Sequence, residues 1–314
     1  MERYPVRRLL PLTAVALLLG AGVAAAGDAA APSASVVATV KTGPKPCGSV
    51  AAAGALWVAN AGDGTLARID PKANRRVAVY PLSPQPCGLV AGGGALWVDG
   101  FGDSTIVRFD LRKLKVTRRI HIGSGPYDVA YAAGSAWSSN YYDGTVSRID
   151  PRTGRITASI KTGGSPGGLR FAAGSLWVGS GSGTQIFRID PRTNRVAKVD
   201  VGQEAPTWLE ATGTAVWAAA GAENVVVRVD PATNAVVATI PVGRQPVDGV
   251  VGPDGLVWIP NLVDNTISRI DPATNTVADT VKVGPGPFVV RQEFGDMWAS
   301  SYRGRDVRRI HVSG

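Results

Sequence analysis

The stretch ALWVANAGDGTLARIDP, residues 55–71, contains the pattern on which the fold depends. Its tryptophan and its arginine each recur seven times along the chain, and a proline ahead of each copy keeps the same period. The successive tryptophans are separated by 40, 40, 40, 40, 41 and 40 residues. The three series are Trp57, Trp97, Trp137, Trp177, Trp217, Trp258 and Trp298; Arg68, Arg108, Arg148, Arg188, Arg228, Arg269 and Arg309; and Pro46, Pro86, Pro126, Pro166, Pro206, Pro246 and Pro287. Such a period predicts seven copies of one structural unit.

Each unit is predicted to contain four short strands, A to D. In the first unit these are residues 48–52, 55–60, 65–70 and 76–82, with a hairpin turn at Asp63-Gly64 and a second turn at Asp70-Pro71. Strand B is apolar at consecutive positions, so both of its faces must be covered. Forty residues cannot cover such faces alone, and the units must therefore stack. The sequence predicts an all-β fold, a seven-bladed β-propeller of four-stranded antiparallel blades over residues 35–314.

Ring closure is also predicted, because the last unit ends after its strand C. Residues 35–43, SVVATVKTG, match residues 235–243, AVVATIPVG, which form a strand D five periods later. We expect the N-terminal strand to complete the last blade, which removes the exposed sheet edges of an open array. An open β-solenoid is the alternative architecture, but its turns are shorter than this period.

The turn between strands B and C also sets a register. A turn centred between residues 62 and 63 places Trp57 opposite Arg68. We expect the guanidinium to lie on the indole, a contact worth about 0.5–1 kcal/mol at a partly exposed site. The same arithmetic holds in most other units.

The N-terminus has the form of a secretory signal peptide over residues 1–26, followed by a short linker over residues 27–34. Arg3, Arg7 and Arg8 precede an apolar stretch over residues 9–26, and Ala24-Ala25-Ala26 offers a cleavage site. An uncleaved membrane anchor is the alternative. We therefore expect an exported protein, either periplasmic or extracellular.

Two families share these motifs. The chain resembles the YVTN-type repeat at residues 56–60, 64–65 and 68–71, and again at residues 238–243 and 274–277. This resemblance implies a bacterial or archaeal surface or periplasmic propeller, usually without a defined activity. The Leu-Trp and Arg-Ile-Asp-Pro cadence also resembles streptogramin (virginiamycin B) lyase, a family that uses histidines and a glutamate with magnesium on its last blades. This chain has only His121 and His311, and no His-x-Glu group in its last two units. The resemblance therefore does not carry over the lyase's histidine site.

A ligand site is expected where the repeat is broken on the face formed by the D–A and B–C loops, here called the top face. Bulky Asp128, Trp208 and Asp248 stand where other units have glycine. Aromatic walls with a few carboxylates suit a sugar, a peptide or a cationic group, and ordinary loop variation is the alternative. The candidate ligand-binding residues are Tyr127, Asp128, Tyr141, Tyr142, Trp208, Glu210, Asp248, Arg291 and Tyr302. Asp99, Phe101, Glu204, Phe288 and Arg303 also depart from the repeat on this face.

Three further patterns have open interpretations. Cys47 and Cys87 lie one period apart near the tops of adjacent innermost strands, so they form either a disulfide or two separate thiols. Arg170 and Glu210 share one repeat position and predict an ion pair between adjacent blades. The recurrent turn aspartates are either turn-forming residues or a ring of calcium ligands; they are Asp63, Asp103, Asp143 and Asp264.

Charge and composition limit the function classes. The chain of 314 residues has a formal charge of +9, and its C–D loops on the opposite, bottom face are basic in the first four units. The basic loop residues are Lys72, Arg75, Arg76, Arg112, Lys113, Lys115, Arg152, Arg155, Arg192 and Arg195. We expect weak contact with an anionic cell envelope through this face and no nucleic-acid binding.

The function predicted from these patterns is noncatalytic binding of an unidentified protein, peptide or carbohydrate at the top face by a monomer. No catalytic residue, metal site or cofactor is assigned. The alternatives are a metal-assisted lyase or lactonase and a structural protein of the cell envelope.

Overall fold

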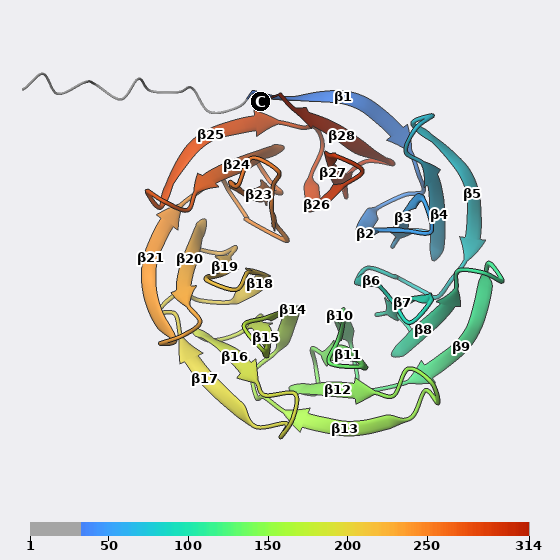
Figure 1. Cartoon of the computed structure of the whole chain (residues 1–314), viewed down its shortest axis with the longest axis horizontal. Helices are drawn as coiled ribbons and strands as arrows, with labels where there is room; N and C mark the ends of the chain where they lie inside the picture. The colour runs from blue at the N-terminus through green and yellow to red at the C-terminus, as the bar shows by residue number, and fades with distance from the viewer. Residues whose placement is uncertain (1–32, 314) are drawn as a thin grey trace, which may run out of the picture. The chain divides into compact units, whose positions relative to one another are not determined.

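The computed structural model describes residues 33–313, which fold into seven four-stranded antiparallel sheets around one axis (Figure 1). The first two blades are β2 (Pro46–Ala52), β3 (Ala55–Asn60), β4 (Thr65–Asp70) and β5 (Arg75–Pro81), then β6 (Leu89–Gly92), β7 (Ala95–Gly100), β8 (Thr105–Asp110) and β9 (Lys115–His121). The third and fourth are β10 (Pro126–Ala132), β11 (Ser135–Asn140), β12 (Thr145–Ile149) and β13 (Ile156–Lys161), then β14 (Pro166–Ala172), β15 (Ser175–Ser180), β16 (Gln185–Ile189) and β17 (Val196–Asp200).

The remaining strands complete the ring. The fifth and sixth blades are β18 (Pro206–Ala211), β19 (Val216–Ala220), β20 (Val225–Asp230) and β21 (Ala235–Pro241), then β22 (Val250–Val251), β23 (Val257–Asn261), β24 (Thr266–Asp271) and β25 (Thr276–Lys282). The seventh contains β26 (Pro287–Glu293), β27 (Asp296–Ser301) and β28 (Asp306–Val312), joined by β1 (Ala34–Lys41). The predicted fold class is confirmed, and in the first blade the predicted strands B and C have the observed bounds.

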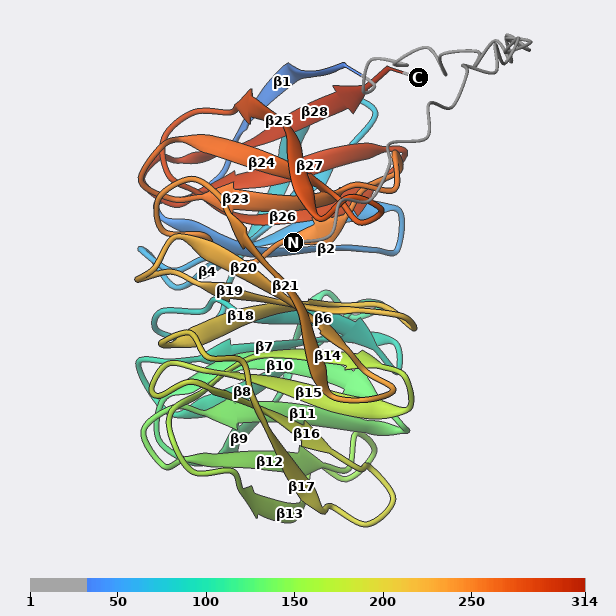
Figure 2. The ribbon, with the colours of Figure 1, turned by 90° about the vertical axis from the view of Figure 1, so that its left-hand side faces the viewer.

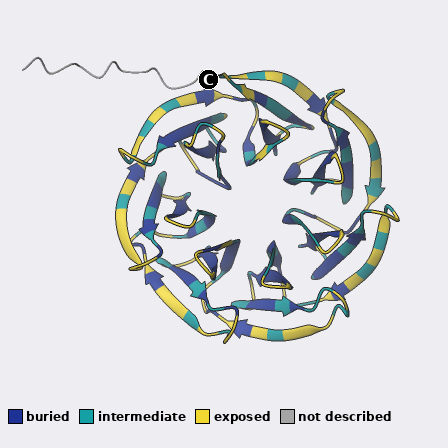
Figure 3. Cartoon of the chain, viewed as in Figure 1, coloured by how far each residue is buried: buried dark blue, intermediate teal, exposed yellow. Residues whose placement is uncertain are grey.

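Burial explains why the blades form. The second strand of each blade is buried at every position, as the apolar run in its sequence predicted. The outermost strands alternate between exposed and less exposed residues (Figure 3). The sheets stand side by side, so each blade covers the faces of its neighbours (Figure 2).

The predicted closure of the ring is confirmed. β1 pairs with β28 in antiparallel register, with Val36 opposite Ile310 and Val40 opposite Val307. β1 begins at Ala34, one residue before the predicted start. The predicted signal peptide, residues 1–26, lies outside the described residues. No helix long and apolar enough to cross a membrane occurs in the part of the chain that the structure describes.

The tryptophan–arginine pairs connect blades as well as strands. Trp57 lies opposite Arg68, as predicted, and the guanidinium is 5.7 Å from the centre of the indole. In later blades the arginine also reaches the next C–D turn: Arg148 Nη1 donates to the Pro191 carbonyl at 2.7 Å. Arg309 makes the equivalent bond to Pro71 at 2.8 Å, so the last blade is joined to the first. The repeated arginine is therefore part of the scaffold.

The turn aspartates bond locally, as turn-forming residues do. Asp63 and Asp103 each accept a hydrogen bond from the hydroxyl of the threonine two residues later. Asp143 and Asp264 each accept one from a backbone N–H of the neighbouring loop. On the opposite face, the basic side chains of the first four C–D loops are exposed. Their contact with an anionic envelope stays a prediction.

Candidate functional site

A cavity of about 350 Å³ opens at the top face. Its walls come from the D–A loops, the B–C loops and the first residues of the innermost strands, where the chain approaches the axis. We call it the aromatic cup, and it is lined by Lys45, Cys47, Ala61, Gln85, Cys87, Asp99, Phe101, Pro126, Tyr127, Trp208, Phe288 and Tyr302. Three of the predicted ligand-binding residues are in this lining: Tyr127, Trp208 and Tyr302.

The aromatic rings of the cup form a continuous row across the top of the propeller. The ring centres of Tyr127 and Trp208 are 5.1 Å apart, although these residues belong to the third and fifth blades. Trp208 continues to Phe288 at 5.3 Å, and Phe288 to Tyr302 at 5.0 Å. Offset or edge-on ring pairs at such distances are favourable. Tyr127, Trp208 and Phe288 also line a second cavity of about 480 Å³.

Two predicted tyrosines extend the row without lining the cup. Tyr141 stacks on Tyr127 with ring centres 5.0 Å apart. Tyr142 is 67% exposed and lies 5.7 Å from Phe101. Both therefore support the rim of the cup, and Tyr142 presents most of its surface to solvent.

Cys47 and Cys87 are joined by a disulfide, which resolves the alternative left open by the sequence. Their Cα atoms are 5.0 Å apart, within the usual range for a disulfide. The two innermost strands approach closely here, and Gly48 N donates to Cys87 O at 3.1 Å. A Cβ at Gly48 would collide with that carbonyl, so the glycine is required for the approach. The disulfide forms part of the wall of the aromatic cup.

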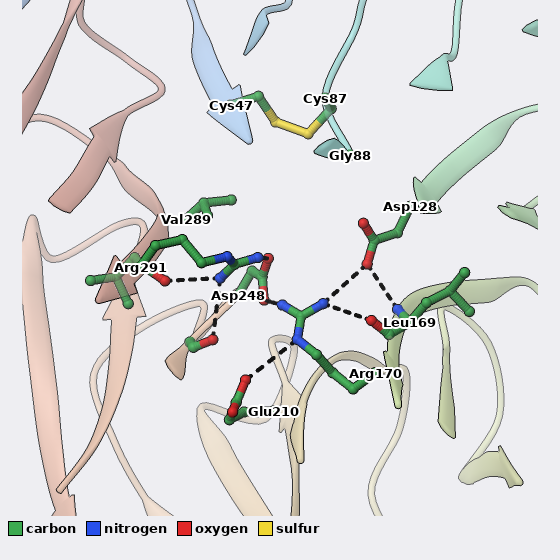
Figure 4. Close-up of polar contacts among 12 residues, drawn as sticks. Cys47, Cys87, Gly88, Asp128, Leu169, Arg170, Glu210, Asp248, Val289 and Arg291 are labelled. Atoms are coloured by element: carbon green, nitrogen blue, oxygen red, sulfur yellow. Dashed lines mark hydrogen bonds and ion pairs between the residues drawn. A yellow bond between two sulfur atoms is a disulfide. The ribbon is translucent and has the colours of Figure 1, made fainter. Parts of the chain in front are cut away.

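Beside the disulfide, further along the innermost strands, lies a cluster of charged side chains (Figure 4). Arg170 contacts three carboxylates: Asp128 at 3.3 Å, Glu210 at 3.4 Å, and Asp248. Asp248 also pairs with Arg291 at 2.5 Å. We call these five residues the axial ion network, and each comes from a different blade, the third to the seventh. The predicted Arg170–Glu210 pair is confirmed as one part of it.

Four of the predicted ligand-binding residues belong to the axial ion network and not to the lining of the cup. Asp128, Glu210, Asp248 and Arg291 are absent from the described lining of the cup and bond one another or Arg170 instead. Burial raises the pKa of both Asp128 and Glu210, and the Arg170 guanidinium opposes this shift. The arrangement suits an internal bridge between blades more than contact with a ligand.

Asp99 lies under the floor of the cup, with no exposed surface. Its carboxyl accepts hydrogen bonds from Cys87 N at 2.7 Å and Gly88 N at 2.8 Å. Burial raises the pKa of Asp99 well above its usual value, the two N–H bonds act against the shift, and Asp128 adds to it. A Cβ at Gly88 would lie 2.6 Å from the Asp99 carboxylate and 2.8 Å from the Asp128 Cα atom, so glycine makes room for both acids.

Lys45 and Gln85 line the cup and were missed by the sequence analysis. Each precedes a repeated proline and adopts the left-handed backbone conformation, with φ of 49° and 51°. The equivalent residues are Gly125, Ala205, Gln245 and Gly286 in the third, fifth, sixth and seventh blades, and they hold the same conformation. A long side chain at a turn position that suits glycine was the available signal, but lysine and glutamine are common in loops.

The two histidines lie outside the cup. His121 is exposed at the end of β9, and His311 Nδ1 is 2.7 Å from Asp296 Oδ1. Within residues 33–313, no three side chains of His, Cys, Asp or Glu are grouped to hold a metal ion. The cup therefore offers aromatic surface, one lysine, one amide and a disulfide.

Together, the fold and the cup define a seven-bladed β-propeller with an aromatic cavity at one end of its axis. No protein-family model and no curated protein matches the chain. Among solved structures, the chain is similar to a streptogramin B lyase, with a TM-score of 0.77 and 15% identity over 88% of this chain and 97% of that one. Virginiamycin B lyase from Staphylococcus aureus gives 0.74 and 15% over 85% and 95%. The WD40 propeller domain of Doa1 gives 0.76 and 14% over 88% and 96%. At these identities the likeness establishes the fold alone, and the YVTN resemblance stays a prediction.

Proposed function

We propose that this protein is an exported, noncatalytic propeller that binds a small organic ligand in the aromatic cup. One observation carries the proposal: partly exposed rings of Phe101, Tyr127, Phe288 and Tyr302 surround a cavity of about 350 Å³. Ligand sites are typically concave, mostly apolar and lined by aromatic side chains with a few polar groups. A small molecule with an apolar ring, or such a group on a peptide or carbohydrate, fits this description.

Binding is favoured over lyase chemistry by the composition of the cup. One of the similar structures is a catalytically inactive histidine-to-alanine variant of virginiamycin B lyase with quinupristin. Among the described residues that line the aromatic cup there is no histidine. A shared propeller does not by itself transfer an activity, because function depends on the site.

Export is supported by two independent features. The first is the leader-like sequence of residues 1–26. The second is the disulfide between the chain's two cysteines, since such bonds persist mainly outside the reducing cytoplasm.

A ligand screen on the purified chain from residue 27 onward tests the proposal. Ring-containing metabolites would be screened by ligand-observed NMR, and each hit measured by calorimetry. Tyr302→Ala and Phe288→Ala are expected to weaken binding about tenfold or more, since each removes ring contacts worth roughly 1–2 kcal/mol. The matched control is Phe294→Ala, because Phe294 is a 40% exposed ring outside the cup.

The outcome against the proposal is also defined. If every hit binds the Phe288→Ala/Tyr302→Ala double variant as tightly as the parent, while circular dichroism shows an intact fold, the aromatic cup is not the binding site.

A further inference from the structure

The charge that solvent can reach in the aromatic cup is positive. Among the described lining residues, the only lysine, arginine, histidine, aspartate or glutamate side chains are those of Lys45 and Asp99. Lys45 is exposed, whereas Asp99 is a lining residue with no exposed surface. Within residues 33–313, Lys45 forms no ion pair. Lys45 is therefore the charged lining residue that a ligand can reach, and it has no ion-pair partner among the described residues.

The acidic groups near the cup are already satisfied. Both oxygens of Asp99 accept backbone N–H groups. The three carboxylates of the axial ion network contact Arg170, and Asp248 also contacts Arg291. A cationic ligand would have to compete with these fixed donors through the floor of the cavity. The acids thus give little reason for the cup to select a cation.

The turns at the rim place two polar residues, Lys45 and Gln85, in the lining of the cup. Lys45 and Gln85 both hold a left-handed conformation that is unfavourable for residues with a Cβ atom. Gly125, Ala205, Gln245 and Gly286 hold the same conformation at the equivalent turns of four other blades, so it is a property of the repeated turn. Lys45 and Gln85, in the first and second blades, line the same cavity as Phe288 and Tyr302 of the seventh blade, which neighbours the first in the closed ring.

We propose that the ligand of the aromatic cup is an aromatic carboxylate: a planar ring that packs on the row of aromatic side chains, with an anionic group that pairs with Lys45 and accepts a hydrogen bond from the Gln85 amide. This inference rests on the proposed function and names the ligand's chemical class. The chain's formal charge of +9, which becomes +7 without Glu2, Arg3, Arg7 and Arg8 of residues 1–26, acts in the same direction, because it raises the local concentration of anions.

Three probes that share one ring system test the charge preference. They are indole-3-acetate, indole and tryptamine, which are anionic, neutral and cationic at neutral pH. Calorimetry is expected to give the tightest binding for indole-3-acetate and the weakest for tryptamine. Lys45→Ala should weaken indole-3-acetate about fivefold, as expected for one partly exposed ion pair, and leave indole unchanged. Raising the salt concentration should weaken the acid alone.

A matched lysine provides the control. Lys72 is also exposed but lies on the opposite face, so Lys72→Ala should change none of the three affinities. If tryptamine binds as tightly as indole-3-acetate, or Lys45→Ala has no effect on the acid, the inference is wrong. In that case the proposed function still holds if Tyr302→Ala weakens indole. If none of the three probes binds up to its solubility limit, the aromatic carboxylate class is excluded, and the general ligand screen decides the proposed function separately.

Discussion

Arg170 and Asp248 are 78 residues apart in the sequence and belong to the fourth and sixth blades, yet they form an ion pair beside the axis of the propeller. The pair bypasses the fifth blade, whose Glu210 also contacts Arg170. The axial ion network therefore links five consecutive blades by charge, while the Cys47–Cys87 disulfide links the other two covalently. Ion pairs and a disulfide therefore both link the innermost strands of the blades.

Removing Arg170 should destabilise the protein strongly. In Arg170→Leu, three carboxylates with little exposed surface lose their shared cation, and breaking such a buried cluster typically costs about 3–5 kcal/mol. Urea unfolding followed by tryptophan fluorescence would measure the change. Arg192→Leu is the control, since that side chain is 90% exposed and its contact with Asp190 is 3.8 Å long. Equal midpoints for the two variants would show that the network adds nothing to stability.

Truncating a repeated tryptophan should have a comparable cost. Trp177 has no exposed surface and packs in the core between neighbouring blades. Trp177→Ala should lower the free energy of unfolding by about 3–5 kcal/mol, because it leaves a large cavity. The exposed ring of Tyr142 offers the comparison, and Tyr142→Ala should change stability by less than about 1 kcal/mol. A small loss in Trp177→Ala would contradict the assignment of the repeated tryptophans to the scaffold.

Breaking the disulfide should destabilise the native state. The bond closes a loop of 40 residues, for which its removal is expected to cost about 2–4 kcal/mol. Urea unfolding with and without dithiothreitol would measure this difference. The double variant Cys47→Ala/Cys87→Ala should unfold like the reduced protein and show no response to the reductant. A response in the double variant would mean that the reductant acts elsewhere.

Glu210 should make the free energy of unfolding decrease as the pH rises. Burial raises the pKa of Glu210 in the folded state, so the folded protein loses stability as the pH rises from the unfolded pKa through the folded one. Glu210→Gln mimics the protonated carboxyl and should lack this loss. The unfolding free energy of the variant relative to the parent is therefore expected to increase as the pH rises from the unfolded pKa of Glu210 through its folded pKa.

Asp70 gives a control of opposite sign. Backbone N–H groups of Ala73 and Lys72 lower its pKa, so its contribution is present above the unfolded pKa and is lost as the pH falls through the folded one. Asp70→Asn should reduce the loss of stability on the acid side only. If Glu210→Gln and Asp70→Asn change the pH profile in the same direction, the assignment of Glu210 is wrong.

Most of the fold could be predicted because its signals are local and repeated. The bounds of strands B and C in the first blade follow from the alternation of turns and apolar runs, whereas strand A begins two residues earlier than predicted and strand D is shifted by one. The register of Trp57 and Arg68 follows from the position of one turn. The closing strand could be recognised because residues 35–43 resemble a strand D five periods away.

The site was predicted less completely. Departures from the repeat correctly indicated that Tyr127, Trp208 and Tyr302 lie together at the top face. They did not separate residues that line the cup from Asp128 and Asp248, which bond to arginines beside it. The difference depends on which way each side chain points from the same innermost strand, and the period carries no information on that.

The sequence by itself determined the number of blades, their four strands and the union of the two chain ends, because each of these follows from patterns that recur along the chain at a spacing of about 40 residues. Only the tertiary structure decided that Arg170 meets Asp248, and that Lys45 shares a cavity with Phe288 and Tyr302. The physical reason is convergence. The innermost strands of nonadjacent blades approach one axis, so side chains distant in sequence become neighbours there.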